Sequence, residues 1–203
     1  MKTRNNVRTL TQLGLLLAIV LVMAYTPLGF LPIGPLSLSL LTIPVAIGAM
    51  VMGPAAGAFL GGAFGVTSFL NAMEGKSAMG AALFGISPVN CFIVCVGARI
   101  LCGLVCGFLY KGVKKAMPRK EKLCCVLGGL SAPVGNTIFF MGALMLFYGS
   151  SSYVQDMAAG MGIANPLVFV LALVGIQGLV EAVVCCAVSA AVTVPLLRVL
   201  KGK

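Results

Sequence analysis

The sequence predicts an all-α integral membrane protein, a single domain over residues 1–203 with six transmembrane helices and both termini in the cytoplasm. Hydrophobic residues make up 60% of the chain and charged residues only 9%, and the mean hydropathy is +1.12. A water-soluble domain of this length needs a far more polar surface. Long uncharged stretches alternate with short charged segments, as expected for helices that cross a bilayer.

Six apolar stretches are interpreted as membrane spans. The second is short and the third is close to the lower limit of about 17 residues. Residues 81–86 are consistent with an interfacial or re-entrant piece. The first stretch is not interpreted as a signal peptide, because no small-x-small cleavage site follows it. The expected spans are Val7–Thr26, Leu38–Met52, Pro54–Leu70, Asn90–Val113, Leu123–Tyr148 and Pro166–Leu197.

The orientation follows from the positions of lysine and arginine. They gather in residues 2–8, in residues 111–122 between the fourth and fifth spans, and in residues 198–203. With six spans all three clusters lie on one side of the membrane, which the positive-inside rule identifies as the cytoplasm. The net charge of +10 is thus explained by topology and by anionic lipid headgroups. It does not indicate a nucleic-acid partner.

Motifs of catalysis and ATP hydrolysis are missing from the sequence. It contains no G-x-x-x-x-G-K-[ST] phosphate loop, no G-x-G-x-x-G dinucleotide loop, no histidine and only four acidic residues. These absences argue against an enzyme and against a self-powered pump, and no cofactor is expected. Transport against a gradient would require an ion or a partner protein as its energy source.

The eight cysteines all lie within predicted spans. A metal site is conceivable, but the spacing is helical and not C-x-x-C, and histidine is missing. We therefore interpret them as small packing residues and predict no metal. They are Cys91, Cys95, Cys102, Cys106, Cys124, Cys125, Cys185 and Cys186.

Two full charges fall inside the spans, Arg99 in the fourth and Glu181 in the sixth. Each costs at least ~2.5 kcal/mol at the bilayer centre, so each needs a partner or a wet cavity. One interpretation is a small-molecule pocket open to the outside, and the other is a structural ion pair between these two residues. The uncharged polar candidates for the pocket are Asn90, Asn136, Gln177 and, at the outer end of the third span, Thr67 and Asn71.

Pro133 lies among glycines in the fifth span, just before Asn136. It predicts a kink or local unwinding. An unwound helix could present free carbonyls to a cavity, and the alternative is an ordinary kink that serves packing.

Small residues recur at intervals of four in two places. Gly53, Gly57, Gly61 and Gly65 predict a smooth face on the third span for close helix packing, which could also let that span slide or rock. Gly53-Pro54 itself predicts a tight turn with proline at the first helical position. Gly14 and Ala18 in the first span predict a face for a partner subunit.

Four segments of the chain together resemble one family. TIPVAIGAMVMGPAAGAFLGGAFGVTSFLNA is similar to the second and third spans of the substrate-binding S components of energy-coupling factor (ECF) vitamin transporters. RILCGLVCGFLYKGVKK resembles their fourth helix, GNTIFFMGALMLFYG their fifth and GLVEAVVCCAVSAAVTVPLLRVLK their sixth. Within the family the chain is most similar to the pantothenate-type members, although Thr42 and Ala98 replace a common histidine and proline.

This resemblance implies a six-helix vitamin-binding subunit of a prokaryotic plasma membrane, with an outward-facing pocket covered by the loops after helices one, three and five. Two ATP-binding cassette ATPases and a transmembrane coupling subunit would supply the energy, with docking through Gly14 and Ala18. Pantothenate would be the substrate, with riboflavin or folate as alternatives. Arg99 would pair with its carboxylate, and Asn136 is the next candidate.

The residues alone are also compatible with two other functions. One is a stand-alone, ion-coupled carrier in which Glu181 binds the ion, although such carriers often contain inverted repeats and none is evident here. The other is a scaffold or assembly factor in which the polar groups serve only helix packing.

Overall fold

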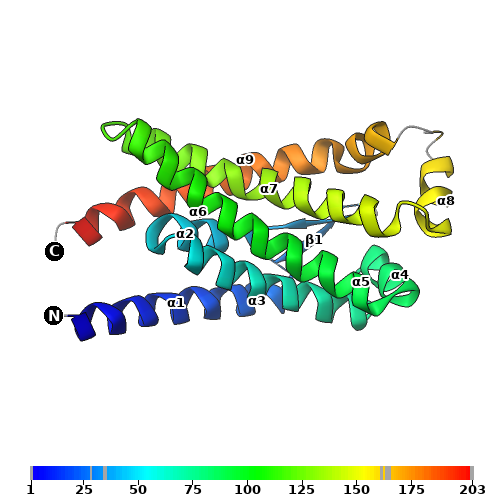
Figure 1. The fold of residues 1–203 in the computed structure, drawn as a ribbon, viewed down its shortest axis with the longest axis horizontal. Coiled ribbons are helices and arrows are strands. Elements are labelled where there is room, and N and C mark those ends of the chain that lie inside the picture. Colours follow the sequence, from blue (N-terminus) through cyan, green and yellow to red (C-terminus); the bar gives the residue numbers. More distant parts are fainter. Residues whose placement is uncertain (1, 28, 34–35, 161, 163–165, 202–203) are drawn as a thin grey trace.

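Long apolar helices run side by side in the computed structural model (Figure 1), which describes residues 2–27, 29–33, 36–160, 162 and 166–201. This arrangement confirms the predicted helical membrane class, since most of each predicted span lies on a helix. The elements are α1 (Lys2–Ala24), β1 (Phe30–Ile33), β2 (Leu36–Ser39), α2 (Thr42–Met52), α3 (Pro54–Met73), α4 (Ala78–Ile86), α5 (Pro88–Phe92), the π-helix η1 (Ile93–Gly97), α6 (Ala98–Ala116), α7 (Glu121–Tyr148), α8 (Ser152–Gly160) and α9 (Pro166–Lys201).

Five segments of the described chain are long and apolar enough to cross a membrane: Val7–Ala24, Pro54–Met73, Pro88–Ala116, Glu121–Tyr148 and Gly178–Val199. The second predicted span differs. Its helix α2 has 11 residues, which at ~1.5 Å per residue reach about half of the ~30 Å hydrocarbon core. The prediction that this helix begins at Leu38 is wrong, because residues 38 and 39 belong to β2.

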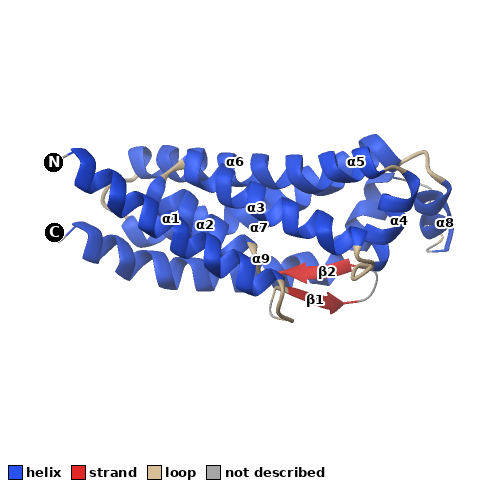
Figure 2. Ribbon diagram, turned by 90° about the horizontal axis from the view of Figure 1, so that it is seen from below, coloured by secondary structure: helices blue, strands red, loops and turns tan. Residues whose placement is uncertain are grey.

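The two strands form an antiparallel hairpin between α1 and α2, with Phe30 opposite Ser39. Pro27, Gly29 and Pro32 explain why no helix forms here, since proline lacks an N–H and glycine favours other conformations. Non-helical backbone is tolerated at membrane depth only where protein or a cavity surrounds it. Accordingly, β2 packs against α9, and Figure 2 shows the hairpin along the flank of the helices.

Backbone irregularity occurs in α5–α6 and not in α7. The chain from Pro88 to Ala116 contains the π-helical turn η1, which no residue pattern predicted; such turns are frequent at functional sites. In contrast, α7 stays helical through Pro133. The local unwinding considered for this helix therefore does not occur.

The three basic clusters lie near one another at one end of the bundle. Figure 1 shows the start of α1, the end of α9 and the α6–α7 connection at that end, with α4, α5 and α8 at the other. The positive-inside argument requires such a grouping. The assignment of this end to the cytoplasm stays a prediction.

The glycines of α3 face the backbone of η1 and α6. A Cβ at Gly57 would collide with the carbonyl of Gly103, and a Cβ at Gly61 with the carbonyl of Arg99. A Cβ at Gly65 would lie 2.6 Å from the Cα of Val96. The missing side chains thus let the two backbones touch over about two helical turns.

Gly53 has a different role from the other three. Its φ is +101° in the turn between α2 and α3, a conformation that side chains rarely adopt. Pro54 then opens α3 at its first position, as expected for proline.

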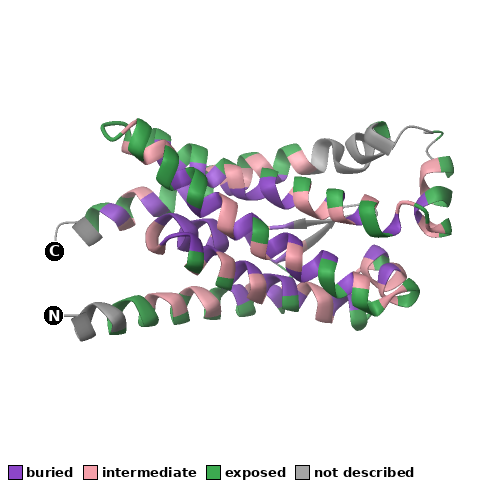
Figure 3. Cartoon of the chain, in the orientation of Figure 1, coloured by how far each residue is buried: buried purple, intermediate pink, exposed green. Residues whose placement is uncertain are grey.

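Thiol groups connect α6 to α7. Cys102 Sγ donates to the carbonyl of Ala132 at 3.1 Å, and Cys106 Sγ to that of Gly128 at 3.4 Å. All eight cysteines are free thiols and seven are buried. The packing role expected for them is consistent with these contacts. Figure 3 shows the buried residues on the inner faces of the bundle, whereas α1 is largely exposed or intermediate.

We expect Gly61→Ala to destabilise the protein, because its methyl group would have to displace the backbone of α6. Overpacking of this kind costs about 1–3 kcal/mol, and the change should appear as a lower Tm in detergent. Gly62→Ala is the matched control, since its methyl group would lie 3.4 Å from the flexible side chain of Ile100. Equal Tm values for the two variants would contradict the backbone contact.

Candidate ligand-binding site

A cavity of about 380 Å³ lies within the bundle, within the ~300–1,000 Å³ typical of small-molecule sites. The end of α1, the hairpin, α3, α4, η1, α6, α7 and α9 all contribute residues to its wall. Ala24 at the end of α1 and Arg99 near the start of α6 line the cavity, whereas the basic clusters lie at the opposite ends of these two helices (Figure 1). The cavity is therefore nearer the end of the bundle opposite the basic clusters, and its opening to the outside of the cell stays a prediction.

Arg99 provides a buried cation on this wall, with 7% of its surface exposed. Its Cζ lies 4.4 Å from the ring centroid of Phe140 and 5.1 Å from that of Phe64, so both rings can stabilise its charge. Nη1 donates to the carbonyl of Val94 in η1 at 3.4 Å. Nε has no hydrogen-bond partner among the described residues, which leaves an N–H group for an anion.

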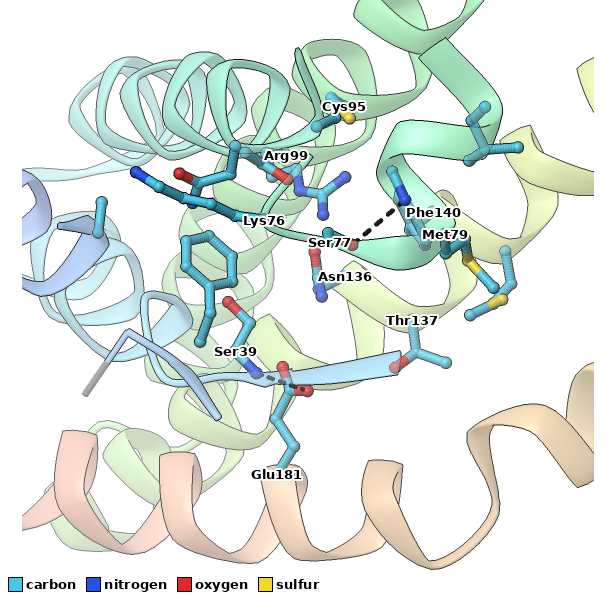
Figure 4. A pocket seen from close by; sticks show the side chains of 18 of the residues that line it. Ser39, Lys76, Ser77, Met79, Cys95, Arg99, Asn136, Thr137, Phe140 and Glu181 are labelled. Atoms are coloured by element: carbon cyan, nitrogen blue, oxygen red, sulfur yellow. Dashed lines mark hydrogen bonds between the residues drawn. The ribbon is translucent and has the colours of Figure 1, made fainter. Parts of the chain in front are cut away.

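Glu181 of α9 and Ser39 of β2 meet on another part of the wall. The backbone N–H of Ser39 donates to Glu181 Oε2 at 3.4 Å. Figure 4 shows Glu181 and Ser39 on the side away from Arg99. In this view Asn136 lies between this pair and Arg99. The hairpin thus brings a serine to a carboxylate 142 positions further along the chain.

Unpartnered polar atoms concentrate around the cavity. Within the described part of the chain six buried side-chain atoms lack a hydrogen-bond partner, and four of them belong to residues that line the cavity. Buried polar atoms are nearly always satisfied in proteins, because each unsatisfied one costs about 1–3 kcal/mol. A polar ligand would satisfy these four, which are Ser39 Oγ, Arg99 Nε, Asn136 Oδ1 and Glu181 Oε1.

The structural ion pair considered for Arg99 and Glu181 is not formed. Among the described residues the ion pair found is that of Lys76 with Glu74. Lys76 Nζ also lies 5.7 Å from the ring centroid of Tyr25, so it links the end of α1 to the α3–α4 connection beside the cavity. The two buried charges are therefore free to contact a ligand separately.

The structure brings four of the seven predicted binding residues to the cavity wall: Arg99, Asn136, Glu181 and Asn71. Thr67 and Asn90 do not line it. The Thr67 hydroxyl donates to the carbonyl of Phe64 at 2.8 Å within its own helix. Gln177 lies on α9 next to the cavity residue Gly178, but its side chain is outside the described residues.

The site prediction missed most of the residues that line the cavity, among them Ser39, Lys76 and Phe140. Ser39 comes from a strand that the apolar pattern did not indicate. Lys76 lies beside Glu74 in the connection between α3 and α4, where a charged residue does not by itself indicate a binding site. Phe140 follows Asn136 by four positions in α7, so helical spacing places both on one face, and this signal could have identified it.

Comparison with known proteins shows the family of the chain. A family model described as the ECF transporter substrate-specific component matches residues 8–193. The chain belongs to this family. It is thus a multi-pass membrane subunit that binds the substrate of an ECF transporter, and the family comprises binding subunits and not enzymes. No curated protein matches the chain, and its membership of the pantothenate-type subgroup stays a prediction.

We expect Asn136→Leu to separate ligand binding from stability. Leucine has a similar volume and removes the unpartnered Oδ1, so the ligand-free S component should keep or raise its Tm. The stabilisation added by a bound ligand should disappear. A thermal-shift assay with a vitamin panel measures both quantities.

Thr67→Val is the control for this experiment, because its hydroxyl bonds within α3. It should retain the ligand-dependent shift in Tm. A retained shift in Asn136→Leu would contradict a role for Asn136 in binding.

Proposed function

We propose that this S component captures pantothenate outside the cell for import. The observation that carries the proposal is the set of unpartnered atoms on the cavity wall, which includes the buried Arg99 Nε. Pantothenate is a carboxylate with an amide and two hydroxyls. The cavity wall offers groups that complement these: the cation of Arg99, the side-chain amide of Asn136, and the hydroxyl and carboxylate of Ser39 and Glu181.

The charged groups favour one orientation of this substrate. Its carboxylate would pair with Arg99, because a buried cation without an anionic partner is costly. Its amide would contact Asn136, whose Oδ1 can accept an N–H. Asn71, also on the wall, adds an amide that can bond the substrate along its length.

The aromatic residues favour pantothenate over a vitamin with a large flat ring. Phe64 and Phe140 both lie against the guanidinium of Arg99, and Phe64 also contacts Phe30 at 6.1 Å between ring centroids. Tyr25 lies near Lys76. Since these rings already have partners, they are poorly placed to sandwich riboflavin or folate.

Import would require partner proteins. The family implies a coupling subunit and ATPases, and we propose two ABC ATPases, since the chain has no phosphate loop of its own. The proposed docking face on α1 contains Gly14 and Ala18, which are both exposed. Beyond the neighbouring backbone of α1, no described atom lies within 4 Å of the position that a Cβ would take at Gly14, so a partner helix could approach closely there.

We expect Arg99→Gln to weaken pantothenate binding strongly. Loss of one partner from a buried charge pair costs 2–5 kcal/mol, or about 30-fold or more in Kd. The affinity for pantothenol, in which a hydroxymethyl group replaces the carboxylate, should change little. Isothermal titration of purified protein with both compounds measures the difference.

Lys76→Gln is the control, because Lys76 also lines the cavity but is paired with Glu74. Its pantothenate affinity should stay within about threefold, as expected for an exposed ion pair. A larger loss in this variant than in Arg99→Gln would move the carboxylate site to Lys76. No binding of pantothenate by the wild-type protein would refute the proposed substrate.

We expect Gly14→Leu to impair assembly with the coupling subunit without changing substrate affinity, since leucine would hold the partner helix away. Co-purification with the ECF module measures assembly, and titration measures affinity. Gly142→Leu on α7 is the matched control, because Gly142 is also exposed and, beyond the neighbouring backbone of α7, no described atom lies within 4 Å of the position that a Cβ would take there. Equal assembly of the two variants would exclude the proposed face.

A further inference from the structure

We propose that Glu181 and Ser39 form a second subsite that binds a hydroxyl group of the substrate and decides which carboxylate the protein accepts. The inference rests on the proposed function and deepens it. Arg99 can pair with any carboxylate that reaches it. A second group must therefore distinguish pantothenate from other small organic acids.

The carboxylate of Glu181 needs more donors than the protein gives it. Only 6% of the residue is exposed, and its described hydrogen bond is the one from the Ser39 N–H to Oε2. A carboxylate has about four acceptor positions, and an ionised group buried without enough partners is costly. Oε1 lacks a partner, so a donor on the ligand would stabilise it.

The hydroxyl of Ser39 is a second unpartnered group beside the carboxylate of Glu181. The Oγ of Ser39 is also buried and unpartnered, with 5% of the residue exposed. Figure 4 shows Ser39 beside Glu181 at the cavity. A serine hydroxyl both donates and accepts, whereas a carboxylate only accepts. A ligand hydroxyl can donate to Glu181 Oε1 and accept from Ser39 Oγ. An ammonium group would donate to both groups, but the proposed substrate carries hydroxyls and no ammonium group, so a substrate hydroxyl is the group that satisfies both.

The same pair fixes the direction of the substrate. A carboxylate placed beside Glu181 would meet a like charge, which is strongly unfavourable. At the other side of the cavity Arg99 attracts it. A molecule with a carboxylate at one end and hydroxyls at the other therefore binds in one orientation, and a carboxylate without hydroxyls leaves Glu181 and Ser39 unpaired.

The decisive test compares pantothenate with its dideoxy analogue, which carries hydrogen in place of both hydroxyls. Isothermal titration of the purified wild-type protein should show binding of the analogue weaker by about 100-fold or more, because sites built for a hydroxyl strongly reject ligands without one. Glu181→Gln should weaken pantothenate binding by about tenfold, as a charge-assisted hydrogen bond becomes neutral. Its affinity for the analogue should stay within about threefold of the wild-type value.

Two further variants sharpen the test. Ser39→Ala removes Oγ but keeps the N–H that donates to Glu181, so pantothenate affinity should fall by about three- to tenfold and analogue affinity should not. Asp156→Asn is the charge-matched control, because Asp156 is exposed on α8 and does not line the cavity. It should leave both affinities unchanged.

The outcomes separate this subsite from the proposed function. If wild-type protein binds no pantothenate, the proposed substrate fails and the subsite falls with it. If it binds both compounds equally, the substrate stands and the subsite is refuted, without any variant being needed. If Glu181→Gln weakens both compounds by the same factor, Glu181 only holds the hairpin in place and the subsite is likewise refuted.

Discussion

The close backbone contact between α3 and α6 is the constraint on which the rest of the structure depends. Hydrophobic burial does not drive helices together in lipid, so close packing must hold them. Gly57 and Gly61 give up side chains so that the carbonyls of Gly103 and Arg99 can approach. Because Gly61 lies against the main chain of Arg99, the same contact that joins the helices also sets the position of the cation in the wall of the cavity.

The environment of Arg99 shows how the bundle accommodates a charge at membrane depth. Phe64 comes from α3 and Phe140 from α7, and both rings lie against the guanidinium. The carbonyl of Val94 in the π-helical turn accepts one N–H. These contacts leave Nε unsatisfied, so the protein holds the cation while reserving a donor for a ligand. Arg99 is therefore a candidate for ligand binding because its Nε–H has no partner, and not only because the residue is charged.

The hairpin and η1 have similar roles, because each supplies a backbone hydrogen bond to one of the two buried charges. In both places non-helical or widened backbone supplies one polar contact to a buried charge, the Ser39 N–H to Glu181 and the Val94 carbonyl to Arg99. Irregular backbone inside a membrane protein is tolerated where it lines a cavity, and both segments do so here. The regular helices thus form the frame, and the irregular segments complete the site.

The sequence alone determined the membrane class, the approximate positions of the long helices, the family and three cavity residues, Arg99, Asn136 and Glu181. These could be predicted because lipid forces each helix to satisfy its own backbone locally and makes charges within spans rare. Only the tertiary structure decided that residues 30–33 pair with residues 36–39 as strands, that Ser39 meets Glu181, and that Thr67 bonds within its own helix and does not line the cavity. Strand pairing and the rotation of each helix depend on packing between segments far apart in the chain, which no local pattern records.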